Sequence, residues 1–449
     1  MPKGQRGAAL AYVIALVAVL SILVGYTWRS IRFNNELVSN LTSETEARML
    51  SLSGIDYALS KIGYSVTKQN LNYSTEGLNY HVEGDHLTFN LEVHSKGLFA
   101  RATSTGKTFL PKNGKAVTTY SLLGEELDIG KLPALTLLNH EGNLVLAGTA
   151  EVTGPILLWR GDVRKATDYN VRWSGTVAHT GRVLDSTSKI WNQLIPNFER
   201  AEEWMKNQSI IFSTRDFKND FDYDSSKVKN LFLPDSGLLV DTVISNTRIF
   251  SKNKLRIGTG AVLSNCKLIA ANVFVTPGST LRNCIVYADR NLSVTGGELS
   301  GGQYLASDSL FFSNNTPIQH FPVFYVEGRT IKSGHPDSSL IGSMILEKAS
   351  GEAIFFGAFL NKPNFDQEIR VNVKSTVNLT GLIYANSYAK MEGNLQGSFI
   401  CQNLKFEYKG TIWVGHLKDA HLKSFSGSKV VAGPLVFPGF TPIAMSESK

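Results

Sequence analysis

The hydrophobic pattern of the first thirty residues is that of a membrane-spanning helix. Residues 7–28 carry no charged side chain and are rich in Ala, Val, Leu and Ile. At about 1.5 Å per residue this stretch forms about 33 Å of helix, enough to cross a bilayer core of about 30 Å. It ends at Trp28 and Arg29, an aromatic and basic pair typical of a membrane interface. A cleaved secretory signal has a shorter apolar region and a small-residue cleavage site, so we expect an uncleaved anchor.

The helical pattern continues beyond the apolar stretch. Between residues 34 and 62 apolar side chains recur at spacings of three and four, without a proline. These apolar positions are Leu37, Leu41, Ala47, Leu50, Leu52, Ile55, Ala58, Leu59 and Ile62. One continuous helix of about fifty residues is therefore predicted. Lys3 and Arg6 before the apolar stretch are matched by Arg29 and Arg32 after it, so charge leaves the membrane orientation open.

A second pattern follows, in which apolar and polar residues alternate. Three alternating runs begin at Leu78, Leu87 and Leu98 and are separated by Gly84 and Gly97. Short alternating runs between glycines are typical of antiparallel strands joined by turns. We expect a small antiparallel sheet directly after the helix.

The strongest internal signal is a repeat. Segments that begin at Val243, Val262, Thr280 and Glu298 resemble one another, at offsets of 19, 18 and 18 residues. The aligned apolar positions are Ile244, Leu263, Leu281 and Leu299, then Leu255, Phe274, Leu292 and Leu310; the aligned small positions are Ser251, Ala270, Ala288 and Ala306. A period near 18 is too short for a helical repeat or a propeller blade and suits one coil of a β-solenoid. Weaker echoes extend this body over residues 135–421.

In such a solenoid each strand pairs with the equivalent strand of the next coil, about 4.8 Å away, so that like residues stack. The aligned Asn246, Asn265 and Asn283 are expected to stack their amides in a ladder, each donating to the next, until Gly301 replaces the asparagine. Strand alternation is expected to turn Lys267 toward solvent.

These patterns predict a mainly β protein. A long N-terminal transmembrane and amphipathic helix precedes a small antiparallel sheet and then a β-solenoid, or single-stranded β-helix, with insertions. The expected boundaries are a leader over 1–7, the helix over 8–62, the antiparallel region over 63–130, the solenoid over 131–425 and a C-terminal tail over 426–449. A helical insertion is expected near 188–208, from the spacing of Trp191, Phe198, Ala201 and Trp204, with a break at Pro196.

Composition narrows the function classes. The 449 residues carry a net charge of +7 that is spread over many short stretches, and no run of Lys and Arg interleaved with aromatic residues stands out. We therefore expect no nucleic-acid partner. Three cysteines rule out a disulfide framework and a four-cysteine zinc site. Cys266 and Cys284 share one repeat position, where either a disulfide or two stacked thiols would fit.

The sequence offers little catalytic chemistry. β-Helix proteins are often polysaccharide lyases or hydrolases, which need clustered carboxylates for calcium or for acid and base roles. The best pair here is Asp289 and Asp308, with Arg290 between them, an arrangement more typical of a solvated turn. We predict no catalytic residue and no enzyme activity.

Metal and cofactor sites are not predicted either. The nine histidines nowhere form the His-x-x-x-His or Glu-x-x-His spacing of a metal site. His81, His86 and His94 lie on neighbouring predicted strands and could meet, but strand histidines are usually solvated. The glycine pairs of the repeat precede no helix that could hold a phosphate.

The first residues resemble a known family. A short basic leader ends at Gly7, the small residue Ala8 follows, and then come the apolar stretch and its polar continuation. This arrangement resembles the N-terminus of type IV prepilins, in particular the atypical minor pilins and tip pseudopilins that begin Arg-Gly-Ala-Ala-Leu. The resemblance covers about the first sixty residues. It implies that a prepilin peptidase cuts between Gly7 and Ala8 and that the new N-terminus is methylated.

One departure from the family pattern bears on the expected role. Most pilins carry Glu at the fifth mature position, where it answers the positive N-terminus of a neighbouring subunit; here that position is Tyr12. A buried ammonium without its carboxylate is costly, so the resemblance implies a filament tip rather than a repeating subunit. The same residues also fit an ordinary signal-anchor helix in which Gly7 is incidental.

We therefore expect a non-catalytic, pilin-like subunit, a minor or tip component of a type IV pilus or secretion filament, or a surface adhesin. The alternative is a membrane-anchored, carbohydrate-active β-helix enzyme. The expected location is the bacterial inner membrane, crossed once, with most of the chain extracytoplasmic. The expected partners are the membrane, other pilin-like subunits and a prepilin peptidase, with a surface polysaccharide as a further candidate.

Overall fold

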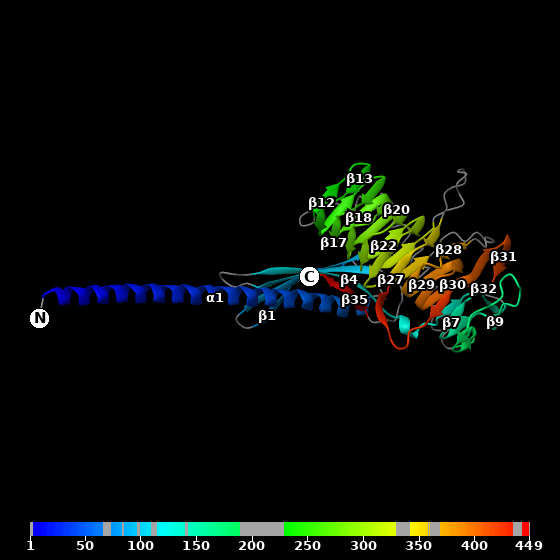
Figure 1. Ribbon diagram of the computed structural model, residues 1–449, viewed down its shortest axis with the longest axis horizontal. Helices are drawn as coiled ribbons and strands as arrows, with labels where there is room; N and C mark the ends of the chain where they lie inside the picture. The colour runs from blue at the N-terminus through cyan, green and yellow to red at the C-terminus, as the bar shows by residue number, and fades with distance from the viewer. Residues whose placement is uncertain are drawn as a thin grey trace.

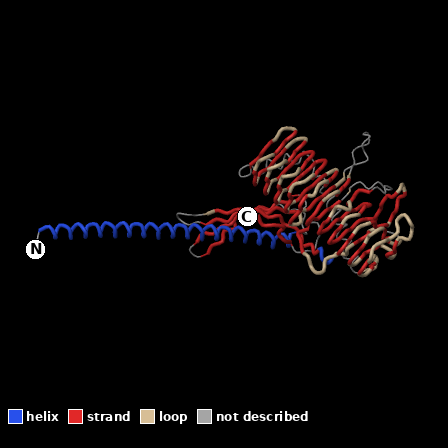
Figure 2. The backbone as a smooth tube through the Cα atoms, in the orientation of Figure 1, coloured by secondary structure: helices blue, strands red, loops and turns tan. Residues whose placement is uncertain are grey.

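The computed structural model contains mainly strands, with one long N-terminal helix, a small antiparallel sheet and a large parallel stack of strands (Figures 1 and 2). The predicted fold class is confirmed. The structure describes residues 3–65, 73–82, 85–96, 99–108, 115–139, 142–188, 229–328, 342–357, 359, 369–433 and 442–448. The expected helical insertion near 188–208 therefore lies almost wholly outside the described residues.

Helix α1 (Lys3–Ser65) is one continuous helix with two different halves. Its N-terminal half extends away from the rest of the molecule, whereas its C-terminal half lies on the antiparallel sheet (Figure 1). Hydrogen bonds join the hydroxyls of Ser43 and Thr108 (2.9 Å) and of Ser51 and Thr119 (2.6 Å). Gly106 lies directly beneath the helix, where a Cβ would overlap the main-chain oxygen of Ala47. Glycine and serine thus allow a very close approach of helix and sheet.

The antiparallel sheet has six strands and is assembled from both ends of the chain. Its strands are β1 (Tyr73–Val82), β2 (Asp85–Lys96), β3 (Phe99–Thr108), β4 (Ala116–Asp128), β34 (Val430–Gly433) and β35 (Pro442–Ser448). Strands β1 to β4 pair in chain order, and β34 and β35 both pair with β4. The segment expected to be a tail thus contributes two strands, β34 and β35, to this sheet. The helix and this sheet together are called the base below.

The solenoid is an insertion between β4 and β34. Asp128 lies where the chain leaves the base and returns to it: its carboxylate accepts hydrogen bonds from the N–H groups of Gly130 (3.1 Å) and Lys429 (2.8 Å) and from the Ser428 hydroxyl (2.6 Å). The short helix η1 (Ile129–Lys131) begins there. Burial raises the pKa of Asp128, but the bonds from Ser428, Lys429, Lys131 and Gly130 outweigh it and leave the pKa below its usual value.

Each coil of the solenoid contributes strands to three faces. The first face contains β14 (Val243–Ser245), β17 (Val262–Ser264), β19 (Thr280–Arg282), β21 (Glu298–Ser300), β24 (Thr316–Gln319), β33 (His421–Lys423), β7 (Glu151–Thr153) and β10 (His179–Thr180). The second contains β12 (Lys229–Phe232), β15 (Thr247–Phe250), β22 (Gln303–Ala306), β25 (Val323–Val326), β5 (Leu135–Leu137), β8 (Ile156–Leu158) and β11 (Val183–Leu184). The third contains β13 (Ser236–Leu239), β16 (Lys254–Ile257), β23 (Ser309–Phe312), β26 (Ser343–Leu346) and β28 (Ile369–Val373).

Longer strands turn a corner and serve two or more faces. These are β18 (Lys267–Val275), β20 (Ile285–Val294), β27 (Ala349–Gly357), β29 (Asn378–Met391) and β30 (Asn394–Tyr408). Beside the end of β30, β32 (His416–Lys418), β6 (Leu144–Ala147) and β9 (Val163–Lys165) form a separate three-stranded parallel sheet, and β31 (Thr411–Val414) makes an antiparallel hairpin with β30.

The order of the coils differs from the order of the chain. Residues 135–184 come first in sequence, yet β5 pairs with β30 and β7 pairs with β33, so that these residues stack beyond the last coil of the repeat. The last strand described before residue 189, β11, pairs with β8 at one end of the stack, and the next described strand, β12, pairs with β15 at the other. Two segments far apart in sequence therefore share one continuous core.

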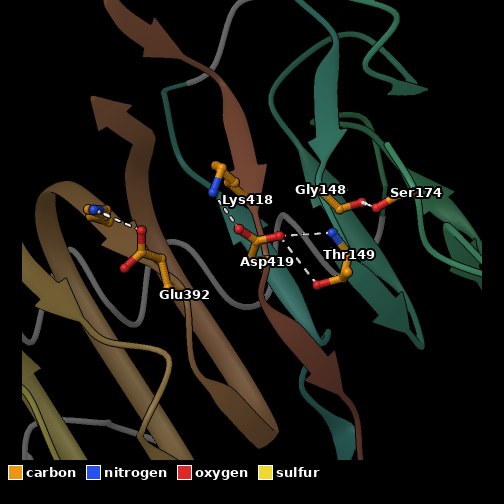
Figure 3. A network of polar contacts seen from close by, with 7 residues as sticks. Gly148, Thr149, Ser174, Glu392, Lys418 and Asp419 are labelled. Atoms are coloured by element: carbon orange, nitrogen blue, oxygen red, sulfur yellow. Dashed lines mark hydrogen bonds and ion pairs between the residues drawn. The ribbon is translucent and has the colours of Figure 1, made fainter. Parts of the chain in front are cut away.

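A polar network fastens the two segments to each other (Figure 3). The carboxylate of Asp419, in the turn between β32 and β33, pairs with Lys418 and accepts the N–H of Thr149 at 2.9 Å, from the turn between β6 and β7. Partial burial raises the pKa of Asp419, but the bonds from Lys418 and Thr149 outweigh it, so the net pKa is lowered. Two groups of Ser174 donate to the Gly148 carbonyl in the same turn: its hydroxyl at 3.2 Å and its main-chain N–H at 2.7 Å.

The predicted register of the repeat is confirmed at its core position. Leu281 pairs with Leu263 on one side and Leu299 on the other, and all three side chains are fully buried. One aligned position is wrong: Val273, not Phe274, pairs with Leu255 and Leu292. An irregularity between Ala270 and Asn272 shifts the register by one residue, which no offset count reveals.

The second face of the solenoid is buried on both sides, which the sequence reading did not predict. Its outward side chains form a continuous apolar row of stacked residues, called the outer row: Phe250, Ile269, Tyr287, Leu305, Tyr325, Phe356, Tyr384 and Ile400. Leu127, Ile129 and Leu132 belong to the same buried cluster. The expected exposure of Lys267 is therefore wrong: 7% of it is exposed, and its ammonium lies 5.3 Å from the Tyr287 ring centre.

Candidate membrane-anchoring and assembly surface

The N-terminal half of α1 presents apolar side chains that the fold does not cover. Ile22 is 72% exposed, Val24 68% and Trp28 71%, and large apolar residues from Val13 to Val38 share this exposure. Helix α1 is therefore long enough and apolar enough to cross a membrane. None of its most apolar stretch is buried within the described protein. Exposed apolar surface on this scale needs lipid or apolar protein around it.

The C-terminal half of the same helix differs in both composition and environment. Its buried residues include Ser43, Ala47, Ser51, Ile55 and Ala58, at spacings of four, four, four and three, and Gly54 beside them. Leu37 and Leu41, which the apolar pattern also includes, are exposed. The residues that face the sheet are therefore mostly small, with Ile55 as a larger member, and Ser43 and Ser51 could be found from sequence only by looking for small residues at helical spacing.

The predicted processing residues lie near the start of α1. Gly7, Ala8 and Tyr12 are helical, but the side chains of the first twelve residues lie outside the described part of the structure. Cleavage between Gly7 and Ala8 therefore stays a prediction.

The three asparagines of the predicted ladder do occupy one position in successive coils. Asn246, Asn265 and Asn283 have φ angles of 50°, 54° and 50°, and each N–H donates to a carbonyl of the next coil. Gly301 (φ 61°) and His320 (φ 59°) hold the same conformation in the following coils. The column therefore requires a left-handed backbone, which asparagine and glycine adopt most readily. Bonds between the amide side chains stay a prediction.

A side-chain amide ladder occurs at a neighbouring corner. The Asn291 amide donates to Asn272 Oδ1 at 3.0 Å, and Ser309 donates to Asn291 Oδ1 at 2.5 Å. The sequence does not reveal this ladder, because the register shift between Ala270 and Asn272 hides its 19-residue spacing.

Cys266 and Cys284 are stacked, buried thiols, so of the two alternatives left open the structure has the unbonded one. Cys284 donates to the carbonyls of Leu263 (3.5 Å) and Arg282 (3.4 Å). Burial, and after it the adjacent Cys266 thiol, raises the pKa of Cys284 well above its usual value. This position stabilises the core and is poorly suited to nucleophilic chemistry.

The candidate carboxylates, Asp289 and Asp308, do not occupy the same position in successive coils. Because Ala288 pairs with Ala306, the residue of the next coil that matches Asp289 is Ser307 and not Asp308. Asp289, Ser307 and Glu327 line a hollow of about 10 Å³, which has room for about one water molecule and not for a sugar ring. Among the described residues no three His, Cys, Asp or Glu side chains converge as metal ligands. The backbone does pair His81 with His86.

No protein-family model matches the chain, and no curated protein is similar to it in sequence. Among solved structures, the competence-associated pilin ComZ from Thermus thermophilus aligns with 90% of this chain and 96% of its own, at 8% identity and a TM-score of 0.16. With so low a TM-score the two backbones do not superimpose, so this likeness carries no argument about fold or function.

Proposed function

We propose that the chain is a membrane-anchored, pilin-like subunit that takes a terminal position in an envelope filament and has no catalytic role. The observation that carries the proposal is the division of α1: an exposed apolar half that continues, without a break, into a half packed on an antiparallel sheet. A helix of this kind can be held in lipid before assembly and among the apolar helices of other subunits after it. The leader ending at Gly7 supports the same role.

The solenoid is the part that such a subunit would present to its surroundings. It lies at the opposite end of the molecule from the N-terminus (Figure 1) and is joined to the base through the Asp128 junction. Membrane insertion of α1 would place the base near the bilayer surface and the solenoid beyond it.

The proposal is tested at the N-terminus of the mature chain. In cells with an active prepilin peptidase, mass spectrometry should find a chain beginning at Ala8, whereas cells without the peptidase should retain Met1 to Gly7. Gly7→Arg should block the cut, and the matched control Gly4→Arg should be processed normally. A leader that is retained in the presence of the peptidase would contradict the proposal and leave a plain membrane anchor.

The terminal position is tested at Tyr12. Cross-linking in membranes should find the wild-type chain beside other pilin-like subunits but not beside a second copy of itself. Tyr12→Glu supplies the carboxylate that repeating pilins carry, and it should permit contacts between copies. A wild-type chain that already forms long self-contacts would exclude the terminal role.

A further inference from the structure

The end of the solenoid farthest from the N-terminus carries a basic and aromatic surface that no part of the proposed function uses. It consists of the segment 159–174 and residues 408–418, which include β31 and β32, and is called the distal end below (Figure 1). Its exposed cations are Arg160, Arg164, Lys165, Arg172 and Lys409. None of these five has a carboxylate partner within ion-pair distance among the described residues.

The segment 159–174 is held in place by its own bonds. The Trp173 indole donates to the Ala150 carbonyl at 3.0 Å, and the main-chain N–H of Trp173 donates to the Ala166 carbonyl at 3.1 Å. The Lys165 ammonium lies 3.9 Å from the centre of the Trp173 ring. With the bonds from Ser174 to Gly148 (Figure 3), these contacts fix the loop that carries Tyr169 and Arg172. The surface is therefore preorganised, which lowers the entropy cost of binding a ligand.

The hairpin of β30 and β31 continues this surface. The rings of Phe406 and Trp413 are stacked, with centroids 6.3 Å apart, and Phe406 lies in one apolar cluster with Val171 of the loop. Lys409 and Lys418 lie 5.4 Å and 5.5 Å from the Tyr408 ring centre. Loop and hairpin thus share a core and present their cations from one end of the molecule.

We propose that the distal end binds an acidic polysaccharide. Guanidinium groups match carboxylates in two-point hydrogen bonds. Two exposed aspartates, Asp162 and Asp168, lie in the same segment as these cations. One oxygen of Asp162 accepts the Val163 N–H at 2.7 Å, and one oxygen of Asp168 accepts the Asn170 N–H at 2.9 Å. Their remaining acceptor capacity suits sugar hydroxyls. Tyr169, 93% exposed, offers an apolar ring to the C–H face of a sugar.

The same observations disfavour a nucleic acid. The carboxylates among the cations repel the dense phosphate charge of a DNA duplex. The sugar–phosphate backbone of DNA also has no hydrogen-bond donor that could bind these carboxylates. A single strand stacks successive bases on several free ring faces, and the exposed Tyr169 offers one. Here the Trp173 and Tyr408 rings carry lysine ammonium groups, and Trp413 stacks on Phe406. The short stretch from Trp159 to Trp173 does interleave cations with aromatic residues, contrary to the expectation from the sequence, and its two aspartates reduce its net charge.

The experiment measures binding of full-length protein, in neutral phosphatidylcholine nanodiscs, to polygalacturonate, with neutral dextran and duplex DNA as comparison probes. Polygalacturonate should bind in a salt-dependent manner, and dextran and DNA should bind at least about tenfold more weakly. The triple variant Arg160→Gln, Arg164→Gln and Arg172→Gln should lose at least about tenfold in affinity for polygalacturonate. Tyr169→Ala should lose several-fold at every salt concentration.

The control is the triple variant Lys229→Gln, Lys252→Gln and Arg256→Gln, which removes three exposed cations at the other end of the solenoid. It should bind polygalacturonate as the wild type does. Equal losses in the two triple variants, tighter binding to DNA than to polygalacturonate, equal binding to dextran, or no binding to any probe would each overturn the proposal. Polysaccharide binding does not depend on leader cleavage. The binding proposal can therefore fail while the proposed function stands, and the proposed function can fail while the binding proposal stands.

Discussion

In the base, one helix meets a sheet through small residues; in the solenoid, each coil meets near-copies of itself. The contact of α1 with the sheet depends on a few positions such as Gly106 and Ala47, where the backbones almost touch. The solenoid core instead repeats one position many times, as Leu263, Leu281 and Leu299 do. A single substitution can therefore separate the helix from the sheet, whereas the solenoid should lose stability coil by coil.

A second contrast concerns exposed apolar surface. In the N-terminal half of α1 apolar residues are exposed because none of the described parts of the fold packs against them. In the solenoid even the outward side chains of the second face are buried. The same residue types are thus exposed in one region and form a core in the other, and the difference lies in which parts of the fold pack against them.

The largest expected effect is in the solenoid interior. Leu281→Asp places a charge between Leu263 and Leu299, among buried apolar side chains, and should cost at least about 3 kcal/mol or prevent folding. The matched control, Arg282→Asp, lies on the exposed side of the same strand and should change stability by less than about 1 kcal/mol. Denaturant unfolding measures both, and equal costs would mean that the register is wrong.

The next effect should fall on the base. Gly106→Val puts a side chain where Ala47 and Ser51 already lie, and should cost about 2–3 kcal/mol by forcing the helix off the sheet. Thr103→Ala, on the same strand, is the control and should be nearly neutral. Amide hydrogen exchange should show loss of protection in residues 43–58 and none in the solenoid. Equal loss in both regions would show that base and solenoid unfold as one unit.

Lys267→Asp tests the outer row. It exchanges a cation over the Tyr287 ring for a buried carboxylate, and should cost about 1–3 kcal/mol. Lys252→Asp, at an exposed position, should cost less than about 0.5 kcal/mol. If thermal melts of the two variants coincide, the second face is not buried on both sides.

Asp128→Asn tests the junction between the two regions. It weakens the bonds from Ser428 and Lys429 and should cost about 1 kcal/mol at neutral pH. Because the folded pKa of Asp128 lies below its usual 3.8, its contribution is full above that value and is lost as the pH falls through the folded pKa. Unfolding curves of wild type and variant should therefore converge in acid. A difference that grows in acid would assign the effect to another group.

The smallest effect on stability is expected in the exposed half of α1. Leu20→Asp with Ile22→Asp should change the unfolding free energy of the body by less than about 0.5 kcal/mol, because neither side chain contacts it. The same pair should sharply reduce the fraction of protein that resists carbonate extraction from membranes, because charges inside a bilayer are costly. Full retention would contradict the assignment of this segment to the membrane.

Much of the fold follows from local sequence. The unbroken α1, the alternating strands of the small sheet and the stacking of Leu281 were predictable because helix spacing, strand alternation and coil period are all read over a few residues. The outer row left a weaker signal: runs such as Ile285-Val-Tyr-Ala are apolar at every position, which is typical of strands buried on both faces. The position of Phe274 was mispredicted because an irregular corner moves the register without changing the composition.

What the sequence by itself determined, then, is which residues repeat, which segment is apolar enough for a membrane, and which three asparagines recur at one position of the coil. The tertiary structure alone decided that residues 135–184 stack beyond β30 and β33, that β34 and β35 return to pair with β4, and that the loop around Tyr169 meets the β30–β31 hairpin. A repeat period specifies the spacing of stacked residues, because each coil satisfies its own hydrogen bonds and apolar contacts. It does not specify the order of the coils, because any coil end with open strand edges and an apolar interior can accept another of matching width.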